Sequence, residues 1–228
     1  MNIAIIPARG GSQRIKNKNI KSFLGKPIIG LTIKKILKTK LFKLIVVTSD
    51  SQKILDIGRL YGADLLIKRS KKLSDNYTAT KKVIINTIKI IEKKYKLDNI
   101  FCFYPCNPFL HIRDINLSLK LIKKWKNCMF FPITQYSHPT ERSLIINKKK
   151  FLSFKVKSKI NQRTQDFTKS FYDSGQFYLA KKNTWKKKFY SCKGIEIPQC
   201  RTCDIDTIND WKRAEIMYPF IKKKFKIL

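Results

Sequence analysis

Two groups of charged residues, near opposite ends of the chain, have the side chains needed to hold a polyphosphate. The first group follows an apolar run at residues 3–6 and contains the adjacent glycines Gly10 and Gly11. Five cationic side chains surround this pair: Arg9, Arg14, Lys16, Lys18 and Lys21. Because glycine lacks a Cβ, its backbone N–H groups can approach a ligand closely, and arginine and lysine add charge that suits phosphate. The stretch predicts a nucleotide phosphate loop, although a solvated turn in a lysine-rich chain has the same composition.

The second group is the acidic pair Asp204 and Asp206, separated by Ile205. In an extended segment, residues i and i+2 project to the same side, so the two carboxylates can share one hard cation. Mg²⁺ is typically held by one or two carboxylates together with phosphate oxygens of a substrate. The alternative interpretation is a capped helix start, because Asp206 and Thr207 directly precede a helical pattern.

The elements between these groups alternate between strand and helix. Buried strands are predicted at residues 3–6, 44–48, 63–67 and 99–105, with helices at 28–40, 51–62 and 78–95. Asp50, after the second strand, is expected to cap the helix that follows. Strand–helix–strand repeats build a parallel α/β sheet, and ligands of such sheets bind beyond the carboxyl ends of the strands. The glycine-containing loop leaves the first strand at such an end.

The rest of the chain continues this pattern with one interruption. We predict a helix at 112–125, strands at 129–134, 177–180 and 195–197, and a final helix with Asn209 or Asp210 near its start. Residues 136–170 break the alternation with two short strand-like pieces and a polar loop, and we interpret them as a small arm or dimer contact. The whole chain, 1–228, is expected to form a single domain.

Composition limits the possible partners. The formal net charge is +35, but the lysines are scattered through every segment, so a nucleic-acid-binding module is not the preferred interpretation. No apolar run is long enough for a transmembrane helix, and because the chain begins with a predicted core strand we expect no signal peptide. The six cysteines are therefore expected to be reduced thiols in the cytoplasm.

The first motif, IIPARGGSQRIKNKN, resembles the PARGGSK-x-x-x-x-KN signature of the sugar-activating cytidylyltransferases, the CMP-sialic acid synthetase family. Matching residues are Arg9, Gly10, Gly11, Ser12, Lys18 and Asn19, while Gln13 replaces the usual lysine. The resemblance implies that this loop holds the triphosphate of CTP, with Arg14 as a further contact. It also implies that Arg69 lies near the cytosine base. Asp204 and Asp206, in the family's D-x-D-T motif, would bind Mg²⁺.

Two further motifs concern the sugar. The loop Tyr104-Pro-Cys-Asn-Pro-Phe109 is similar to the Y-x-x-x-P-F form of the family's pseudaminic acid branch. The segments around Arg163, Gln165 and Asp166, and around Gln176, resemble its R-x-Q-D and N-G-A-I-Y blocks. These residues are the implied sugar contacts, and an arginine suits the carboxylate of a nine-carbon sugar acid.

The resemblance implies a three-layer Rossmann-like nucleotidyltransferase fold, a homodimer, and transfer of CMP from CTP to the anomeric hydroxyl of the sugar acid. Arg9, Lys18 and Asp206 would be the catalytic residues, with no decisive general base. Pseudaminic acid is the first candidate acceptor, and N-acetylneuraminic or legionaminic acid is the alternative. An inactive structural homologue is a further alternative, which the Gln13 departure keeps open and the retained Arg9, Lys18, Asp204 and Asp206 disfavour.

Overall fold

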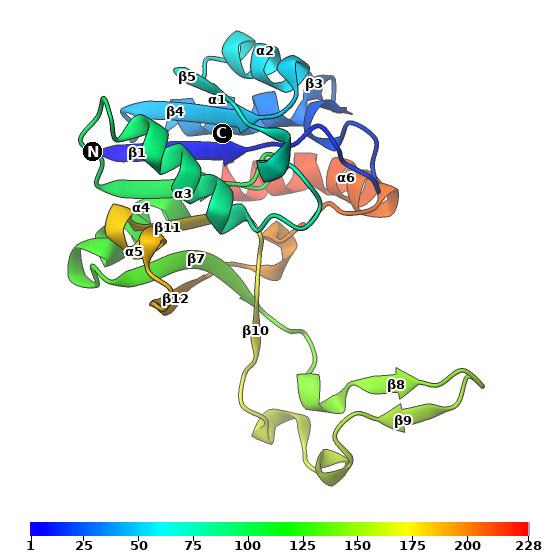
Figure 1. Ribbon diagram of the computed structural model, residues 1–228. Helices are drawn as coiled ribbons and strands as arrows, with labels where there is room; N and C mark the ends of the chain where they lie inside the picture. The colour runs from blue at the N-terminus through cyan, green and yellow to red at the C-terminus, as the bar shows by residue number, and fades with distance from the viewer. Residues whose placement is uncertain (228) are drawn as a thin grey trace.

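An eight-stranded sheet forms the centre of the protein in the computed structural model, which describes residues 1–227 (Figure 1). The strands are β1 (Asn2–Pro7), β4 (Leu44–Ser49), β5 (Leu65–Lys68), β6 (Asn99–Phe103), β7 (Cys128–Gln135), β10 (Phe171–Asp173), β11 (Phe177–Lys181) and β12 (Ser191–Glu196). Their order is β10-β7-β11-β6-β1-β4-β5, with β12 beside β7. β1 pairs in parallel with β4 and β6, and β4 with β5, whereas β11 runs antiparallel to β6. The predicted α/β fold with a mostly parallel sheet is confirmed.

Helices cover both faces because each strand alternates its apolar side chains between them. Ala4 and Ile6 of β1 belong to the core cluster shared with α1 (Ile28–Lys38), α2 (Gln52–Leu60) and α4 (Ile112–Lys124). Ile3 and Ile5 face the opposite cluster, under α3 (Thr80–Ile91) and α5 (Lys182–Lys186). The long α6 (Ile208–Phe225) packs Trp211 against Phe23 in a third cluster, beside the short hairpin of β2 (Ser22–Phe23) and β3 (Lys26–Pro27).

The parallel register brings the carboxyl ends of β1, β4, β5 and β6 to the same edge of the sheet. Within one or two residues of these ends the chain presents Arg9, Asp50, Arg69 and Tyr104. Four residues that are far apart in the sequence therefore lie along one edge. This edge is where ligands bind in open α/β sheets.

Residues 136–170 leave the body of the protein as an arm (Figure 1). Its tip is an antiparallel hairpin of β8 (Leu144–Ile146) and β9 (Leu152–Phe154), whose residues pair only with each other within the described chain. Large apolar side chains are exposed on this hairpin: Leu144, Ile145, Ile146, Phe151, Leu152 and Phe154. The arm thus carries apolar surface that no other part of residues 1–227 covers.

Three local expectations differ from the structure. α2 begins at Gln52 after Ser51, and Asp50 does not cap it, because the Asp50 carboxylate accepts a hydrogen bond from Gly10 instead. β12 begins at Ser191, four residues before the predicted strand. The short β10 was not expected, since three residues carry too little periodicity to signal a strand. The six cysteines are free, and no helix within residues 1–227 is long and apolar enough to cross a membrane.

Candidate functional site

A cavity of about 470 Å³ lies at the carboxyl edge of the sheet. Most of the residues predicted for the nucleotide and the metal line it: Arg9, Ser12, Arg14, Lys18, Asn19, Arg69, Asp204 and Asp206. Tyr104, from the predicted sugar-binding set, lines it as well. The N-terminal loop and the late acidic pair therefore open onto one space, although almost 190 residues separate Lys18 from Asp206 in the sequence.

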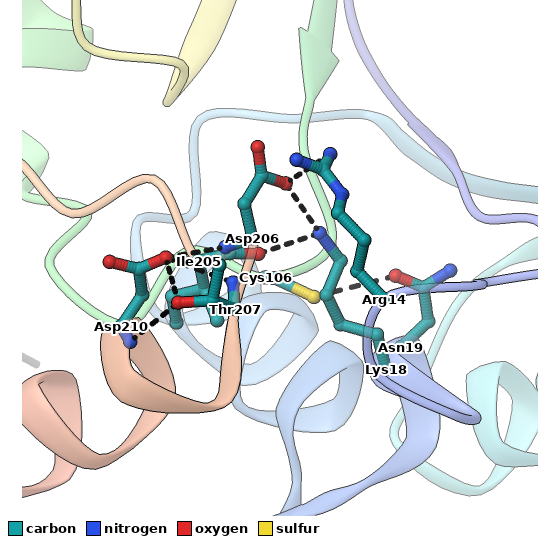
Figure 2. Close-up of polar contacts among 8 residues, drawn as sticks. All are labelled: Arg14, Lys18, Asn19, Cys106, Ile205, Asp206, Thr207 and Asp210. Atoms are coloured by element: carbon teal, nitrogen blue, oxygen red, sulfur yellow. Dashed lines mark hydrogen bonds and ion pairs between the residues drawn. The ribbon is translucent and has the colours of Figure 1, made fainter. Parts of the chain in front are cut away.

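Direct contacts join the two groups (Figure 2). Lys18 lies in a single 3₁₀ turn, and its Nζ donates to the Ile205 carbonyl at 2.6 Å and to Asp206 Oδ1 at 3.3 Å. Arg14 Nη2 lies 2.8 Å from the same Asp206 oxygen. Two cations of the phosphate loop thus meet one carboxylate of the acidic pair. A bound triphosphate and a cation at this point would interact with all three charges.

The start of α6 explains why Asp206 is available to the cavity. Thr207 is the N-cap, and its hydroxyl accepts from the Asp210 N–H at 3.2 Å, while Asp210 Oδ2 accepts from the Thr207 N–H at 2.9 Å. This reciprocal capping box pairs the N–H groups of Thr207 and Asp210 and does not use the Asp206 carboxylate. The capped helix start that the sequence offered as an alternative is therefore present, with Thr207 as the cap, and the Asp206 carboxylate is not part of it.

A buried ion pair anchors the segment that precedes the acidic pair. Arg201 Nη1 lies 2.6 Å from Asp114 Oδ2, and Nη2 lies 3.1 Å from Oδ1, with both side chains almost fully buried. This bidentate geometry fixes orientation as well as distance. The ion pair fixes the segment that leads into Asp204 against the first turn of α4.

The surroundings of Asp204 disfavour its charged form. The pKa of Asp204 is raised by burial first and by the neighbouring Asp206 carboxylate second. Within the described residues no cluster of three or more histidine, cysteine or acidic side chains could hold a metal ion by itself. Two carboxylates facing a polyphosphate cavity do fit Mg²⁺, because this ion commonly takes one or two carboxylates and completes its shell with water and substrate phosphate.

The glycine pair acts differently from the prediction. The Gly10 N–H donates to Asp50 Oδ1 at 2.9 Å and so is not aimed at the cavity, and neither Gly10 nor Gly11 belongs to its lining. A Cβ on Gly10 would lie 3.0 Å from Ser51 Cβ, so this glycine allows the loop to pack against the end of β4. Asp50, which sequence reasoning assigned to a helix cap, therefore holds the loop at Gly10, while the Asn19 side chain donates to the Arg9 carbonyl at 2.8 Å. Its place after a parallel strand was the signal for a site role.

Two arginines, Arg9 and Arg69, line the cavity. Arg69 is buried, its Nη2 lies 4.0 Å from Asp50, and its Nε has no hydrogen-bond partner within residues 1–227. Burial lowers the pKa of Arg69, and the Asp50 charge opposes that change. Arg9 Nη1 donates to Asn76 Oδ1 at 2.7 Å and to the Asp75 carbonyl at 3.1 Å. Asn76 is a cavity residue that the sequence motifs did not indicate.

The predicted sugar contacts separate into three places. Tyr104 reaches the cavity, and its ring packs edge-on against Tyr178, whose hydroxyl donates to Asp173. Gln176 instead is buried and donates from Nε2 to the Arg201 carbonyl at 2.8 Å, so in this structure it supports the site and does not line it. Its backbone carbonyl accepts from the Tyr104 N–H at 3.2 Å, which makes it a positioning residue for Tyr104.

The remaining predicted sugar contacts, Arg163, Gln165 and Asp166, lie exposed in the arm. They do not line the cavity of their own chain. The structure therefore does not bring them together with Tyr104, because β7 and β10 lead the arm away from the body of the protein (Figure 1).

This combination of a mostly parallel sheet and a cationic loop facing an acidic pair defines a nucleotide-binding α/β protein, and comparisons specify the class. The sequence profile described as "Cytidylyltransferase" matches residues 3–218. The chain is 32% identical over 222 residues to pseudaminic acid cytidylyltransferase of Campylobacter jejuni subsp. jejuni serotype O:2, covering 95% of this chain and 96% of that protein. It is 27% identical over 216 residues to N-acylneuraminate cytidylyltransferase B of Danio rerio, covering 93% of this chain and 50% of that protein.

Solved structures agree on the fold. CMP:2-keto-3-deoxy-manno-octonic acid synthetase, solved in complex with CTP, superposes with a TM-score of 0.71 at 14% identity and covers 96% of this chain and 98% of that one. The chain belongs to the cytidylyltransferase family.

Proposed function

We propose that the protein transfers CMP from CTP to the anomeric hydroxyl of a nonulosonic acid, with pseudaminic acid as the preferred acceptor. The observation that carries this proposal is the meeting of Arg14 and Lys18 with Asp206 in one cavity at the carboxyl edge of the sheet. The match to pseudaminic acid cytidylyltransferase over almost the entire chain supports the choice of acceptor. N-acetylneuraminic and legionaminic acids are the alternatives, since relatives acting in those syntheses also match.

In the proposed reaction, the anomeric oxygen of the sugar attacks the α-phosphorus of CTP. The bond from the α-phosphorus to the oxygen bridging to the β-phosphate breaks, pyrophosphate leaves, and the hydroxyl proton passes to solvent. Arg14 and Lys18 would neutralise the charge that develops on the leaving group, which is the form of catalysis that prepositioned cations supply. Arg69, with a buried donor free for a ligand, and Arg9 would orient the nucleotide.

We further propose that Asp204 and Asp206 hold Mg²⁺. The raised pKa of Asp204 supports this, because a cation between the carboxylates would relieve the repulsion that contributes to it. When bound, the ion would supply charge neutralisation on the triphosphate. Binding of Mn²⁺, followed by electron paramagnetic resonance, should be lost in Asp204→Asn/Asp206→Asn, which tests the site without reference to turnover.

A homodimer is also part of the proposal. The exposed apolar side chains of the β8–β9 hairpin support it, since Ile146 is 61% and Leu152 64% exposed in the single chain. Arg163 and Asp166 lie on the same arm, away from their own cavity. If the arm packs on a second copy, these residues become candidates for the partner's sugar site.

We also propose a cytoplasmic location. The six free cysteines support it, because a reducing compartment keeps thiols unpaired.

The deciding experiment measures pyrophosphate release with each of the four NTPs crossed against a panel of nonulosonic acids. Turnover is expected with CTP and pseudaminic acid. Asp206→Asn should reduce it by at least 100-fold while leaving the circular dichroism spectrum unchanged. Asp56→Asn, an exposed carboxylate on α2, is the matched control and should behave as wild type. The proposal would be contradicted if none of the nonulosonic acids in the panel supported turnover, or if Asp206→Asn turned over as fast as wild type.

A further inference from the structure

A second cavity, of about 350 Å³, lies between α1 and α6. Five lysines line it: Lys26, Lys34, Lys35, Lys38 and Lys222. Leu31, Tyr61 and Tyr218 complete its walls. Among the described residues none lines both this α1–α6 pocket and the cavity of Asp204 and Asp206. The pocket is therefore a separate feature, and the proposed reaction makes no use of it.

The charge of the α1–α6 pocket is of one sign. No acidic residue belongs to its lining, and its five lysines form no ion pair within residues 1–227. In a concave site with low-dielectric walls, charges of one sign reinforce each other and concentrate counter-ions. The pocket differs in this respect from a convex lysine-rich surface, where each ammonium group is hydrated separately.

Lys35 sits in the floor of the pocket and is only 3% exposed. Its Nζ donates to the Pro108 carbonyl at 2.5 Å and lies 5.2 Å from the centre of the Tyr218 ring. Burial first, and the charges of Lys222 and Lys38 second, lower the pKa of Lys35 to about 7. Within residues 1–227 the Lys35 ammonium has a carbonyl and a ring as partners and no carboxylate, so its charge is poorly compensated and an anion in the pocket would supply the counter-charge.

The loop at residues 104–109 lies between the α1–α6 pocket and the cavity of Asp204 and Asp206, which we call the active cavity. Lys35 holds the carbonyl of Pro108, and the Thr32 hydroxyl donates to the Pro105 carbonyl at 2.8 Å. The Tyr218 ring stacks on Phe109 with ring centres 6.3 Å apart. Pro105 also lines the active cavity. An anion that draws the Lys35 ammonium towards the pocket would weaken its contact with Pro108 and so act on this loop.

We propose that the α1–α6 pocket is a second, non-catalytic site for a diphosphate-class polyanion, which contacts Lys35, Lys38 and Lys222 and acts on the 104–109 loop. Five lysine side chains line a space of this size and no acidic residue among residues 1–227 does, which favours an anion with more than one negative charge. The diphosphate could be free pyrophosphate or the tail of a nucleotide, because both present the same oxygens.

The test separates the pocket from the active cavity. In Arg14→Gln/Lys18→Gln, two cations of the active cavity are removed and the pocket is intact. Titration of this variant with sodium pyrophosphate, by calorimetry at 150 mM salt without divalent metal, should show one binding event per chain. Adding Lys38→Gln and Lys222→Gln should weaken it at least tenfold. Both lysines are exposed at the mouth of the pocket, so folding is expected to be retained.

The control replaces two exposed lysines of α6 outside the pocket, Lys212→Gln and Lys223→Gln, in the same background. It removes the same charge and should leave the affinity within twofold. If Arg14→Gln/Lys18→Gln binds no pyrophosphate, the affinity belongs to the cavity of Asp204 and Asp206 and the proposal is overturned. If both quadruple variants lose the same affinity for pyrophosphate, the binding reflects the net charge of +35 and the proposal is also overturned. Neither result depends on turnover, so the proposed reaction is judged separately.

Two further measurements complete the experiment. CDP binding as tightly as pyrophosphate identifies a nucleotide tail as the ligand, whereas binding of pyrophosphate alone identifies the free anion. Hydrogen exchange of residues 104–110 should change on adding pyrophosphate to Arg14→Gln/Lys18→Gln. Unchanged exchange at saturation would overturn the proposed action on the loop.

Discussion

Replacement of Lys35 by methionine is expected to change how the free energy of unfolding depends on pH. Methionine keeps an unbranched stem in the space between α1 and α6 and removes the ammonium group. In the wild-type protein, burial first and the charges of Lys222 and Lys38 second lower the pKa of Lys35 from 10.5 to about 7. The other titratable groups around the pocket are Lys26, Lys34, Tyr61 and Tyr218.

The sign follows from proton binding in the two states. Between pH 7 and pH 10 the unfolded chain keeps the Lys35 proton, whereas the folded chain loses it. Stability rises with pH wherever the unfolded state binds more protons. The free-energy cost of burying the charged Lys35 is therefore complete below pH 7 and decreases as the pH rises. The full difference in pKa corresponds to roughly 5 kcal/mol, of which about 2–3 kcal/mol should be recovered between pH 6 and pH 9.

Urea unfolding of wild type and Lys35→Met at pH 6, 7, 8 and 9, at constant ionic strength, measures this contribution. The difference in unfolding free energy should shift in favour of wild type by about 2–3 kcal/mol across the range. Lys53→Met, at an exposed position on α2, is the control and should follow the wild-type profile. If the wild-type and Lys35→Met curves stay parallel, Lys35 keeps its proton in the folded protein and the reasoning is refuted.

Other outcomes follow from the site and the arm. Asp114→Asn should destabilise the protein by about 3–5 kcal/mol in chemical denaturation, because it leaves the buried Arg201 charge without a partner. Arg69→Met should lower kcat/KM for CTP by about 10–100-fold, the range of a lost charged hydrogen bond, with an unchanged circular dichroism spectrum. Tyr178→Phe should raise KM for the sugar acid more than for CTP, since it releases the Asp173 contact beside Tyr104. Ile145→Asp should convert dimer to monomer in sedimentation velocity, and an unaltered sedimentation coefficient would argue against the arm as the dimer contact.

The succession of elements was accessible from local pattern. The apolar runs that became β1, β4 and β6 are short and continuous, as buried parallel strands are, and α1 and α4 repeat apolar residues at helical spacing. Because parallel strands place their carboxyl ends at one edge, the position of Arg9 near the cavity also followed, whereas that of Arg69 was implied by the family resemblance. The acidic pair was identified from its spacing and motif, and both of its carboxylates line the cavity.

Polar partners were harder to predict than elements. Asp50 stands where a helix cap would be expected, yet it binds the Gly10 N–H, which lies 40 residues away in sequence. Gln176 looked like a sugar contact, but its amide satisfies the carbonyl of Arg201. In both cases several partners of equal chemistry were available, and the packing of distant segments selected one.

The α/β class, the order of the elements and the residue types of the N-terminal loop and the acidic pair can be read from local pattern, because periodicity and motif spacing are local properties. The contacts of Lys18 and Arg14 with Asp206, the hydrogen bond from Gly10 to Asp50 and the position of Arg163 on an arm away from its own cavity became visible only in the folded chain. Contact between groups far apart in the chain depends on strand register and on the direction in which loops leave the sheet. No local pattern encodes these two quantities.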